Sequence, residues 1–323
     1  MRYIKLGSTD IKVSVVCFGS WAIGGWLWGG TDINESIKAI EAGIENGINF
    51  IDTAPAYGKG LSEEIIGEAL KKQKRENVVI ASKCGMVWHL KKNQFWYKYD
   101  DDTDLYRNLT KESIKYELEA SLKRLGTDYI DLYQTHIQDY DTPISETMET
   151  LLSLKKEGKI RAIGVSNATI ADIKYYSQYG FVDSDQEKYS LLDLDPEKEI
   201  LPWCNEHGTT FLAYSPLSQG LLTGKLDPER KFQNDDIRIG NPRFSKENIE
   251  KVNNILNLKL KNFAAQKGIS IENLAISWVT SHKKTVALCG ARNAMQAEEN
   301  SKAGDIILNE SEMETIKSYF INN

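Results

Sequence analysis

Residues 129–165 decide the fold, and they read YIDLYQTHIQDYDTPISETMETLLSLKKEGKIRAIGV. The segment opens with a short apolar run at 129–134 and closes with another at 161–165, and both runs are typical of buried strands. Between them, apolar residues recur at helical spacing over 144–156, and Gly158 ends the pattern. A strand, a helix and a second strand in this order predict two parallel strands joined by a crossover helix.

The same alternation repeats along the chain. Short apolar runs predict eight strands, at 15–18, 49–52, 78–82, 129–134, 161–165, 182–186, 209–214 and 286–288. Helical patterns follow them at 36–44, 112–125, 144–156, 169–177, 246–267, 271–281 and 295–302. Two more helices are predicted from their start signals, one with Ser62 as its N-cap and one that opens at Asp195. A capping box that opens at Ser311 predicts the last helix. Eight strands that each precede a helix predict an α/β fold, the (β/α)8 TIM barrel, as a single domain over 1–323.

An open, doubly wound sheet is the alternative fold. Such sheets bind dinucleotides through a GxGxxG turn after the first strand. The turn at 19–24 reads GSWAIG and lacks that spacing, and so does the glycine-containing stretch at 58–63. Both observations favour the barrel.

Three further segments complete the predicted architecture. Residues 3–14 hold two short runs separated by a Gly7-Ser8 turn, which predicts an N-terminal β-hairpin that covers the bottom of the barrel. Residues 84–109 and 215–245 are long for loops, and loops of this length usually carry function or small elements of their own. In a barrel both would lie over the C-terminal mouth, where active sites sit.

Composition narrows the class of function. The chain of 323 residues is 41% hydrophobic and 27% charged, as soluble proteins are, and its net charge of −6 gives no electrostatic reason to bind nucleic acid or an anionic membrane. The first residues lack the apolar core of a signal peptide, and no apolar run reaches the ~20 residues of a membrane span. We therefore expect a cytoplasmic enzyme for a small molecule, with a monomer favoured.

Neither the cysteines nor the histidines are spaced as metal ligands. Cys17, Cys84, Cys204 and Cys289 are scattered without a CxxC pair, and the four histidines show neither HxH nor HExxH spacing, so we expect no metal site. Three of these cysteines, at 17, 84 and 289, fall near strand ends. They are either small core residues or thiols that make the activity sensitive to oxidants.

Three ionisable side chains stand at the ends of neighbouring predicted strands. Asp52 ends the second strand, Lys83 follows the third and His136 follows the fourth, while Tyr57 lies five residues beyond Asp52 in the loop above. Residues two apart share a face of a strand, so each of the three side chains can point into the barrel mouth. Each residue alone has an ordinary structural explanation, such as an internal Lys–Asp pair. Together, at three successive strand ends, they indicate an active site.

This set suits the reduction of a carbonyl group, which needs a hydride and a proton. A tyrosine hydroxyl with a pKa near ~10 is a poor acid at neutral pH. The Lys83 ammonium, kept charged by Asp52, is expected to lower the pKa of Tyr57 by stabilising its phenolate. His136 can hydrogen-bond the carbonyl oxygen and stabilise the negative charge that develops on it. The sequence therefore predicts Tyr57, Asp52, Lys83 and His136 as catalytic residues, with Tyr57 as the proton donor.

Several segments resemble the aldo-keto reductase superfamily, in the order in which its members carry them. Residues 51–58, IDTAPAYG, are similar to its D-T-A-x-x-Y-G signature, and 81–83 and 131–136 are similar to its lysine and histidine segments. The family's cofactor-binding segments resemble 163–167, 213–217 and 290–300. The glycine-rich start and the Gly-Ala-Arg triplet look most like the bacterial branch that includes general-stress and inositol-linked NADP-dependent reductases.

The resemblance implies NADP(H) bound in extended form across the barrel mouth. The residues implied to bind it are Ser20, Trp21, Asp52, Ser166, Asn167, Gln186, Tyr214, Ser215, Pro216, Leu217, Ser218, Gln219, Lys225, Gly290, Ala291, Arg292, Gln296, Glu299 and Asn300. Among them, Arg292 lies just before a helix N-terminus, and both features suit the 2′-phosphate of NADPH, which favours NADPH over NADH.

The substrate pocket is less defined by the sequence. The candidates to contact a carbonyl substrate are Trp21, Trp26, Trp28, Tyr57, Trp88 and His136. The pair Ile137-Gln138 stands where many family members carry Trp-Pro, which removes one aromatic wall. Two other functions stay open: an NADPH-binding sensor or regulatory module with little turnover, and a dehydratase or isomerase on the same barrel. The presence of all four catalytic positions favours the reductase.

Overall fold

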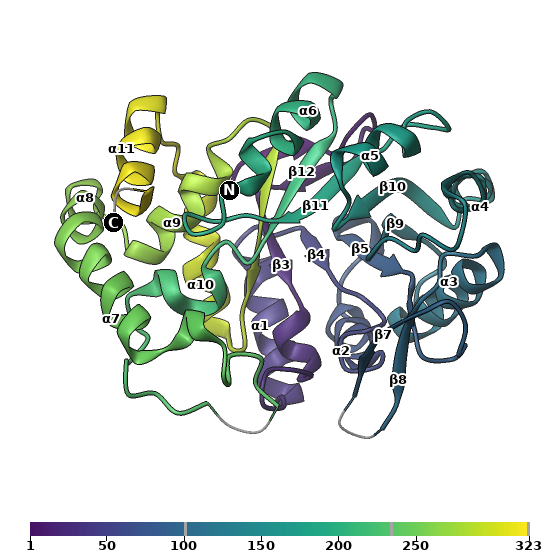
Figure 1. Cartoon of the computed structure of the whole chain (residues 1–323), viewed down its shortest axis with the longest axis horizontal. Coiled ribbons are helices and arrows are strands. Elements are labelled where there is room, and N and C mark those ends of the chain that lie inside the picture. Colours follow the sequence, from purple (N-terminus) through teal and green to yellow (C-terminus); the bar gives the residue numbers. More distant parts are fainter. Residues whose placement is uncertain (100–101, 233–234, 322–323) are drawn as a thin grey trace.

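The computed structural model describes residues 1–99, 102–232 and 235–321. In these ranges, eight parallel strands close into a barrel. They are β3 (Val16–Gly19), β4 (Phe50–Asp52), β5 (Val79–Cys84), β9 (Ile130–Thr135), β10 (Ile160–Ser166), β11 (Ser184–Lys188), β12 (Thr210–Tyr214) and β13 (Thr285–Gly290). Helices surround the strands (Figure 1), so the predicted (β/α)8 fold is confirmed.

The helices follow the strands in the predicted order. One helix follows each of the first six barrel strands. In chain order these helices are α1 (Ile33–Glu45), α2 (Leu61–Leu70), α3 (Lys111–Leu125), α4 (Ile144–Lys156), α5 (Ile170–Tyr176) and α6 (Ile200–His207). The chain after β12 forms α7 (Lys246–Ile255), α8 (Lys261–Lys267) and α9 (Ile271–Thr280), and the chain after β13 forms α10 (Ala294–Lys302) and α11 (Glu310–Ile321). No helix in the described ranges has the length and apolar character needed to cross a membrane.

Two of the predicted helix starts are wrong. Ser62 is the second residue of α2 rather than its N-cap, because its hydroxyl turns inward and donates to the Ser20 hydroxyl at 2.7 Å. The last helix begins before Ser311, and its capping box is formed by Asn309 and Glu312, whose side chains accept from each other's backbone N–H groups. Both errors come from several cap-forming residues lying close together in the sequence.

Two further boundaries after β10 are shifted. The sixth strand begins at Ser184, two residues later than predicted, although the Asp183 N–H still donates to the Ile163 carbonyl at 2.7 Å, while the Asp183 carboxylate accepts from the Ile163 N–H at 3.0 Å. Asp195 lies in a short 3-10 turn (Asp195–Glu197), and α6 starts only at Ile200. The order of elements is unaffected.

The interior of the barrel is apolar at the bottom. Alternate side chains such as Phe50, Ala81 and Leu132 point inward and are completely buried. They pack against Leu6 and Val13 of the N-terminal hairpin, which pairs β1 (Tyr3–Lys5) with β2 (Lys12–Ser14). The hairpin therefore closes the bottom, as predicted, and each strand keeps its inward register up to the mouth.

The two long segments do carry small elements. After β5 the chain forms a three-stranded sheet of β6 (Met86–Val87), β7 (Gln94–Lys98) and β8 (Asp104–Arg107), in which β8 is central. The segment after β12 contains 3-10 turns at Ser218–Thr223 and Pro242–Phe244. In Figure 1 both long segments lie at the lower edge of the picture, on either side of α1.

The turn of the hairpin depends on a glycine. Gly7 has φ +53°, and a Cβ on it would lie 2.5 Å from the Asp183 Cα. We expect Gly7→Ala to lower the free energy of unfolding by about 2–3 kcal/mol, because it adds backbone strain and a clash with the barrel. Urea denaturation followed by circular dichroism measures the change.

Gly126→Ala is the matched control. Gly126 has a similar φ of +65°, but a Cβ there meets no atom of the described chain within 4 Å. This variant should therefore lose about 1–2 kcal/mol, the conformational cost alone. Losses of equal size in the two variants would contradict the close docking of the hairpin.

Candidate active site

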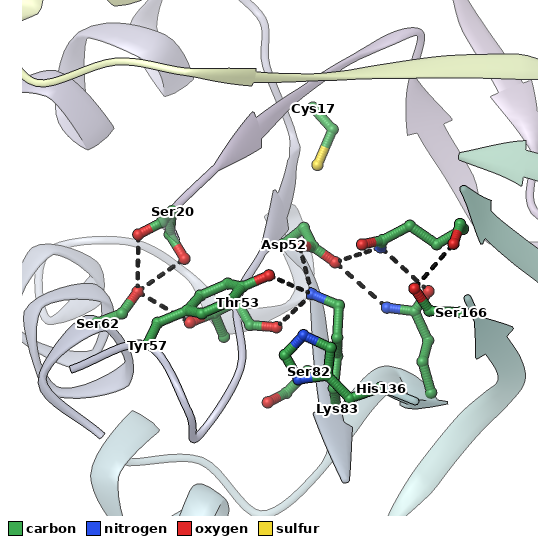
Figure 2. Close-up of polar contacts among 12 residues, drawn as sticks. Cys17, Ser20, Asp52, Thr53, Tyr57, Ser62, Ser82, Lys83, His136 and Ser166 are labelled. Carbon is green, nitrogen blue, oxygen red and sulfur yellow. Dashed lines mark hydrogen bonds and ion pairs between the residues drawn. The ribbon is translucent and has the colours of Figure 1, made fainter. Parts of the chain in front are cut away.

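The side chains of Asp52, Lys83 and Tyr57 meet at the mouth of the barrel (Figure 2). The Lys83 Nζ donates to Asp52 Oδ2 at 2.6 Å, to the Tyr57 hydroxyl at 3.1 Å and to the Thr53 carbonyl at 2.9 Å. Lys83 and Asp52 are fully or almost fully buried. One ammonium thus contacts both the carboxylate that balances its charge and the hydroxyl whose ionisation it favours.

His136 reaches the same place from the next strand. Its backbone N–H donates to the Cys84 carbonyl at 2.8 Å, and its own carbonyl accepts from the Asn167 amide at 3.0 Å. The imidazole stands edge-on to the Tyr57 ring, with 5.6 Å between ring centroids. The structure therefore brings together the four side chains that the strand-end pattern singled out.

The charges of this group are set by burial and by Lys83. Burial works against the Lys83 ammonium, but Asp52 and Tyr57 outweigh it and raise the pKa of Lys83. Burial also raises the pKa of Tyr57, and Lys83 lowers it as expected but opposes the effect of burial only in part, so the pKa of Tyr57 lies above its usual value. Burial, with a smaller contribution from Lys83, holds the pKa of His136 well below its usual range. At neutral pH the site holds a neutral tyrosine, a charged lysine and a neutral imidazole.

Two amide side chains complete the shell around Asp52. Its Oδ1 accepts from Gln186 at 2.8 Å and from Gln134 at 3.2 Å, while Oδ2 accepts from Lys83. Gln186 was predicted to bind the carboxamide of the cofactor, and in the structure its side-chain amide donates a hydrogen bond to Asp52. Gln134 was missed as a site residue, although it has the same strand parity as His136, and that parity was the available signal.

A cavity of about 1290 Å³ opens over these residues. Of the residues that the family resemblance implied for the cofactor, all but Ser218 line it, and of the substrate candidates all but Trp88 do. Ser218 is buried and exchanges hydrogen bonds with Ser190 and Asp193 instead. Trp88 packs on the apolar cluster beneath the β7–β8 hairpin. The side chains of these two residues therefore do not line the cavity, and their contacts with cofactor or substrate stay predictions.

The wall beside Asp52 is held by a chain of hydrogen bonds. Asn167, at φ +51°, donates to the Ser166 hydroxyl at 3.1 Å and accepts from the Tyr214 hydroxyl at 3.0 Å. Ser166 donates to the Gln186 carbonyl at 2.8 Å, and its own carbonyl accepts from Gln138 at 3.0 Å. Gln138, which departs from the family's usual proline, therefore braces the strand that presents these polar groups to the cavity.

Two loops that line the cavity are joined by hydrogen bonds. The backbone N–H groups of Leu27 and Gly29 donate to the Asp235 carboxylate at 2.8 and 3.0 Å, and the Ile237 N–H donates to the Leu27 carbonyl at 3.0 Å. These contacts tie the segment after β3 to the segment after β12. Nothing in the sequence pattern pointed to Asp235.

The cavity fits an elongated anionic ligand such as a dinucleotide. The indole N–H groups of Trp21 and Trp28 are buried at its wall and have no hydrogen-bond partner in the described ranges, so acceptor oxygens of a ligand would satisfy them. Arg292, at the start of α10, donates to the carbonyls of Trp28 and Gly30 at 3.1 and 2.6 Å. It has no carboxylate partner among the described residues, so its charge is available to a phosphate.

The substrate end is aromatic. Trp26 and Trp28 line it from the loop after β3, and Trp96 and Tyr97 of the β7–β8 hairpin also line it, with the Tyr97 ring edge-on to Trp26 at 5.5 Å between centroids. The hairpin therefore supplies aromatic rings near the position where Ile137 replaces the family's usual tryptophan.

The four cysteines are all free and buried. Burial raises the pKa of Cys17, Cys84 and Cys289 above the usual thiol range, which suppresses the reactive thiolate. Of the two interpretations left open by the sequence, small core residues are favoured.

Comparison with known proteins identifies the family. The model of the aldo/keto reductase family matches residues 15–320, so the chain belongs to this family of nicotinamide-dependent oxidoreductases. A relative, the NADH-specific methylglyoxal reductase of Escherichia coli, is 43% identical over 318 residues, which cover 97% of this chain and 96% of that protein.

Solved structures agree with the fold and the family. A glycerol dehydrogenase from Gluconobacter oxydans matches with a TM-score of 0.88 at 34% identity, covering 99% of this chain and 95% of its own. An aldo/keto reductase from Klebsiella pneumoniae in complex with NADP and acetate matches with a TM-score of 0.72 at 28% identity, covering 98% and 95%. Members of the family thus differ in the dinucleotide and in the substrate that their names give.

The pKa directions predict how the rate of carbonyl reduction depends on pH. With the roles predicted from the sequence, reduction would need protonated Tyr57, whose pKa is raised, and neutral His136, whose pKa is lowered. We expect kcat for reduction to stay level from about pH 6 to 9 and to fall only above ~10, the ordinary pKa of a tyrosine. A fall of kcat as the pH drops through about 6.5, the ordinary pKa of a histidine, would contradict a His136 that stays neutral.

The Lys83→Met variant tests the source of this behaviour. Without the ammonium the pKa of Tyr57 rises further, so the high-pH limb should move upward while kcat falls by about 10²-fold or more. The pH profile separates this from simple damage to the fold, which would lower kcat without moving the limb.

Proposed function

We propose that this chain reduces aldehydes or ketones to alcohols with a nicotinamide cofactor, and that Tyr57 donates the proton. The observation that carries the proposal is the Lys83 ammonium 3.1 Å from the Tyr57 hydroxyl, with Asp52 at 2.6 Å on its other side. A positive charge in this place lowers the cost of forming the tyrosinate during proton transfer, at the moment when the carbonyl oxygen takes the proton.

Each residue then has a separate task. The neutral His136 imidazole hydrogen-bonds the substrate carbonyl oxygen and orients it toward Tyr57. Tyr57 gives its proton to that oxygen, Lys83 stabilises the resulting tyrosinate, and Asp52 keeps Lys83 charged and in place. The nicotinamide, when bound, supplies the hydride. Its carboxamide would be held by Ser166, Asn167 and Gln186, with Tyr214 against the ring.

We further propose NADPH as the preferred dinucleotide. Arg292 lies at the start of α10 with no carboxylate partner in the described part of the chain, which suits a 2′-phosphate. The phosphates nearer the ring would lie along 215–219 and Lys225. A relative whose name specifies NADH and a structural neighbour in complex with NADP make this preference a property to be measured on the chain itself.

Tyr57→Phe tests the proton donor. We expect reduction of a panel of aldehydes and ketones to slow by about 10²–10⁴-fold, because the phenyl ring has no proton to give. NADPH should still bind, since the ring itself is kept, and quenching of nicotinamide fluorescence measures that binding. Normal turnover in this variant would contradict the role of Tyr57. A wild-type chain that binds NADPH but reduces no compound of the panel would point to a sensor instead.

Arg292→Ala tests the cofactor preference. Loss of a charge-assisted hydrogen bond should lower the ratio of kcat/KM with NADPH to kcat/KM with NADH by about 10–100-fold. Arg230 is an exposed arginine that also lines the cavity, so Arg230→Ala serves as the control and should change the ratio by less than about threefold. A wild-type preference for NADH that Arg292→Ala leaves unchanged would refute the assignment.

A further inference from the structure

We propose that Arg107 selects carbonyl substrates that carry a carboxylate at the end away from the reacting carbon. The inference rests on the proposed reductase function and names the substrate class of the same site. It starts from an arginine that no motif singled out, on the hairpin after β5.

Arg107 lies at the substrate end of the cavity. It is the last residue of β8, where it pairs with Met86 of β6 and Gln94 of β7. Together with Met86 and Trp96 it lines the same cavity as Tyr57 and His136. It stands on the same face of β8 as the buried Leu105, two residues earlier, which packs on the cluster that contains Ala56, next to Tyr57.

The positive charge of Arg107 has no acidic partner in the described ranges. Its guanidinium carbon stands 4.0 Å from the centroid of the Trp96 ring, which fixes the plane of the group. Its Nε–H is buried without a hydrogen-bond acceptor there. Two other cations that line the cavity differ, because Arg238 pairs with Asp236 and Lys225 with Glu272, whereas Arg292 stands at the end of the cavity proposed for the dinucleotide.

A carboxylate is the group that fits this donor. An arginine presents Nε–H and an Nη–H as two parallel donors, which match the two oxygens of a planar carboxylate. A buried donor without an acceptor is costly, so a ligand that pairs with it gains more than one that contacts an exposed charge. Aromatic side chains such as Trp96 and Tyr97 line the same cavity as Arg107 and His136 and suit an apolar spacer, so the class is an oxo-acid whose carbonyl and carboxylate lie at opposite ends.

The alternative is that Arg107 only packs the hairpin against Trp96. Two aldehydes that differ only at the carboxyl group separate these roles, namely 4-carboxybenzaldehyde and its methyl ester, and the ratio of their rates is compared between the wild type and each variant. We expect wild-type kcat/KM to favour the acid by about 10–100-fold, through KM, at saturating cofactor. Arg107→Met keeps an apolar stem over Trp96 and should abolish the preference, with the ester changed by less than about threefold. The same comparison between 4-oxobutanoate and butanal tests a substrate in which a shorter, aliphatic spacer separates the carbonyl from the carboxylate.

Two further variants sharpen the test. Arg107→Lys keeps the charge but loses the paired donors, so it should retain only part of the preference. Lys92→Met removes an exposed cation from the same long segment, outside the cavity lining, and should leave the acid-to-ester ratio unchanged. Acid and ester reduced equally well by the wild type, or equal losses for both in Arg107→Met, would overturn the proposal and leave the reductase function intact.

A binding measurement keeps the two proposals apart. If neither aldehyde of either pair is reduced with either dinucleotide, the reductase proposal fails for these substrates. Titration of the cofactor complex with 4-carboxybenzaldehyde still tests Arg107, because the wild type should bind it about 10–100-fold more tightly than Arg107→Met. Equal affinities would refute the Arg107 site.

Discussion

The buried pair between Lys83 and Asp52 is the interaction on which the rest of the site depends. Two opposite charges inside a barrel are tolerated only when the geometry is close and the remaining polar atoms are hydrogen-bonded, and losing one partner of such a pair typically costs about 3–5 kcal/mol. Here the other Asp52 oxygen accepts from Gln134 and Gln186, and Lys83 also reaches the Thr53 carbonyl and the Tyr57 hydroxyl. Strands β5, β9 and β11 thus each contribute a side chain that compensates for the burial of Asp52. The same compensation fixes Lys83 where it favours ionisation of Tyr57.

The barrel makes this arrangement possible because its interior is layered. Below the charged layer, inward side chains and the N-terminal hairpin form an apolar plug, which keeps water away from the lower side of the ion pair. Above it, the cavity opens to ligands. Residues two apart on a strand share a face, so Asp52 points inward like Phe50, and Lys83 points inward like Ala81. A short apolar strand that ends in one charged residue is therefore enough to place that charge at the mouth.

This regularity explains what could be predicted from the sequence. Strand order, inward parity and the meeting of Asp52, Lys83 and His136 all follow from local patterns that repeat around a closed barrel. The direction of the Tyr57 pKa does not, because it depends on how deeply the loop buries the hydroxyl. Ser218 and Trp88 lie in loops where neither period applies, so their orientation was not predictable from the pattern. Asp235 and Arg107 act through contacts between segments that are distant in sequence, and no spacing reveals these.

The division between strands and loops also has a functional meaning. Of the groups proposed to transfer or stabilise the proton, Asp52 and Lys83 lie on strands, His136 directly follows one, and Tyr57 is held by its hydrogen bond from Lys83. The groups that would recognise the rest of the substrate, Trp96, Tyr97 and Arg107, sit on a hairpin that contributes nothing to closing the barrel. Changing such a hairpin can therefore alter which carbonyl compound enters without disturbing the proton donor. Structural neighbours and relatives named for different substrates are consistent with that separation. In this chain the hairpin brings a charge without an acidic partner among the described residues, and in our proposal that charge would make an otherwise aromatic pocket prefer anionic substrates.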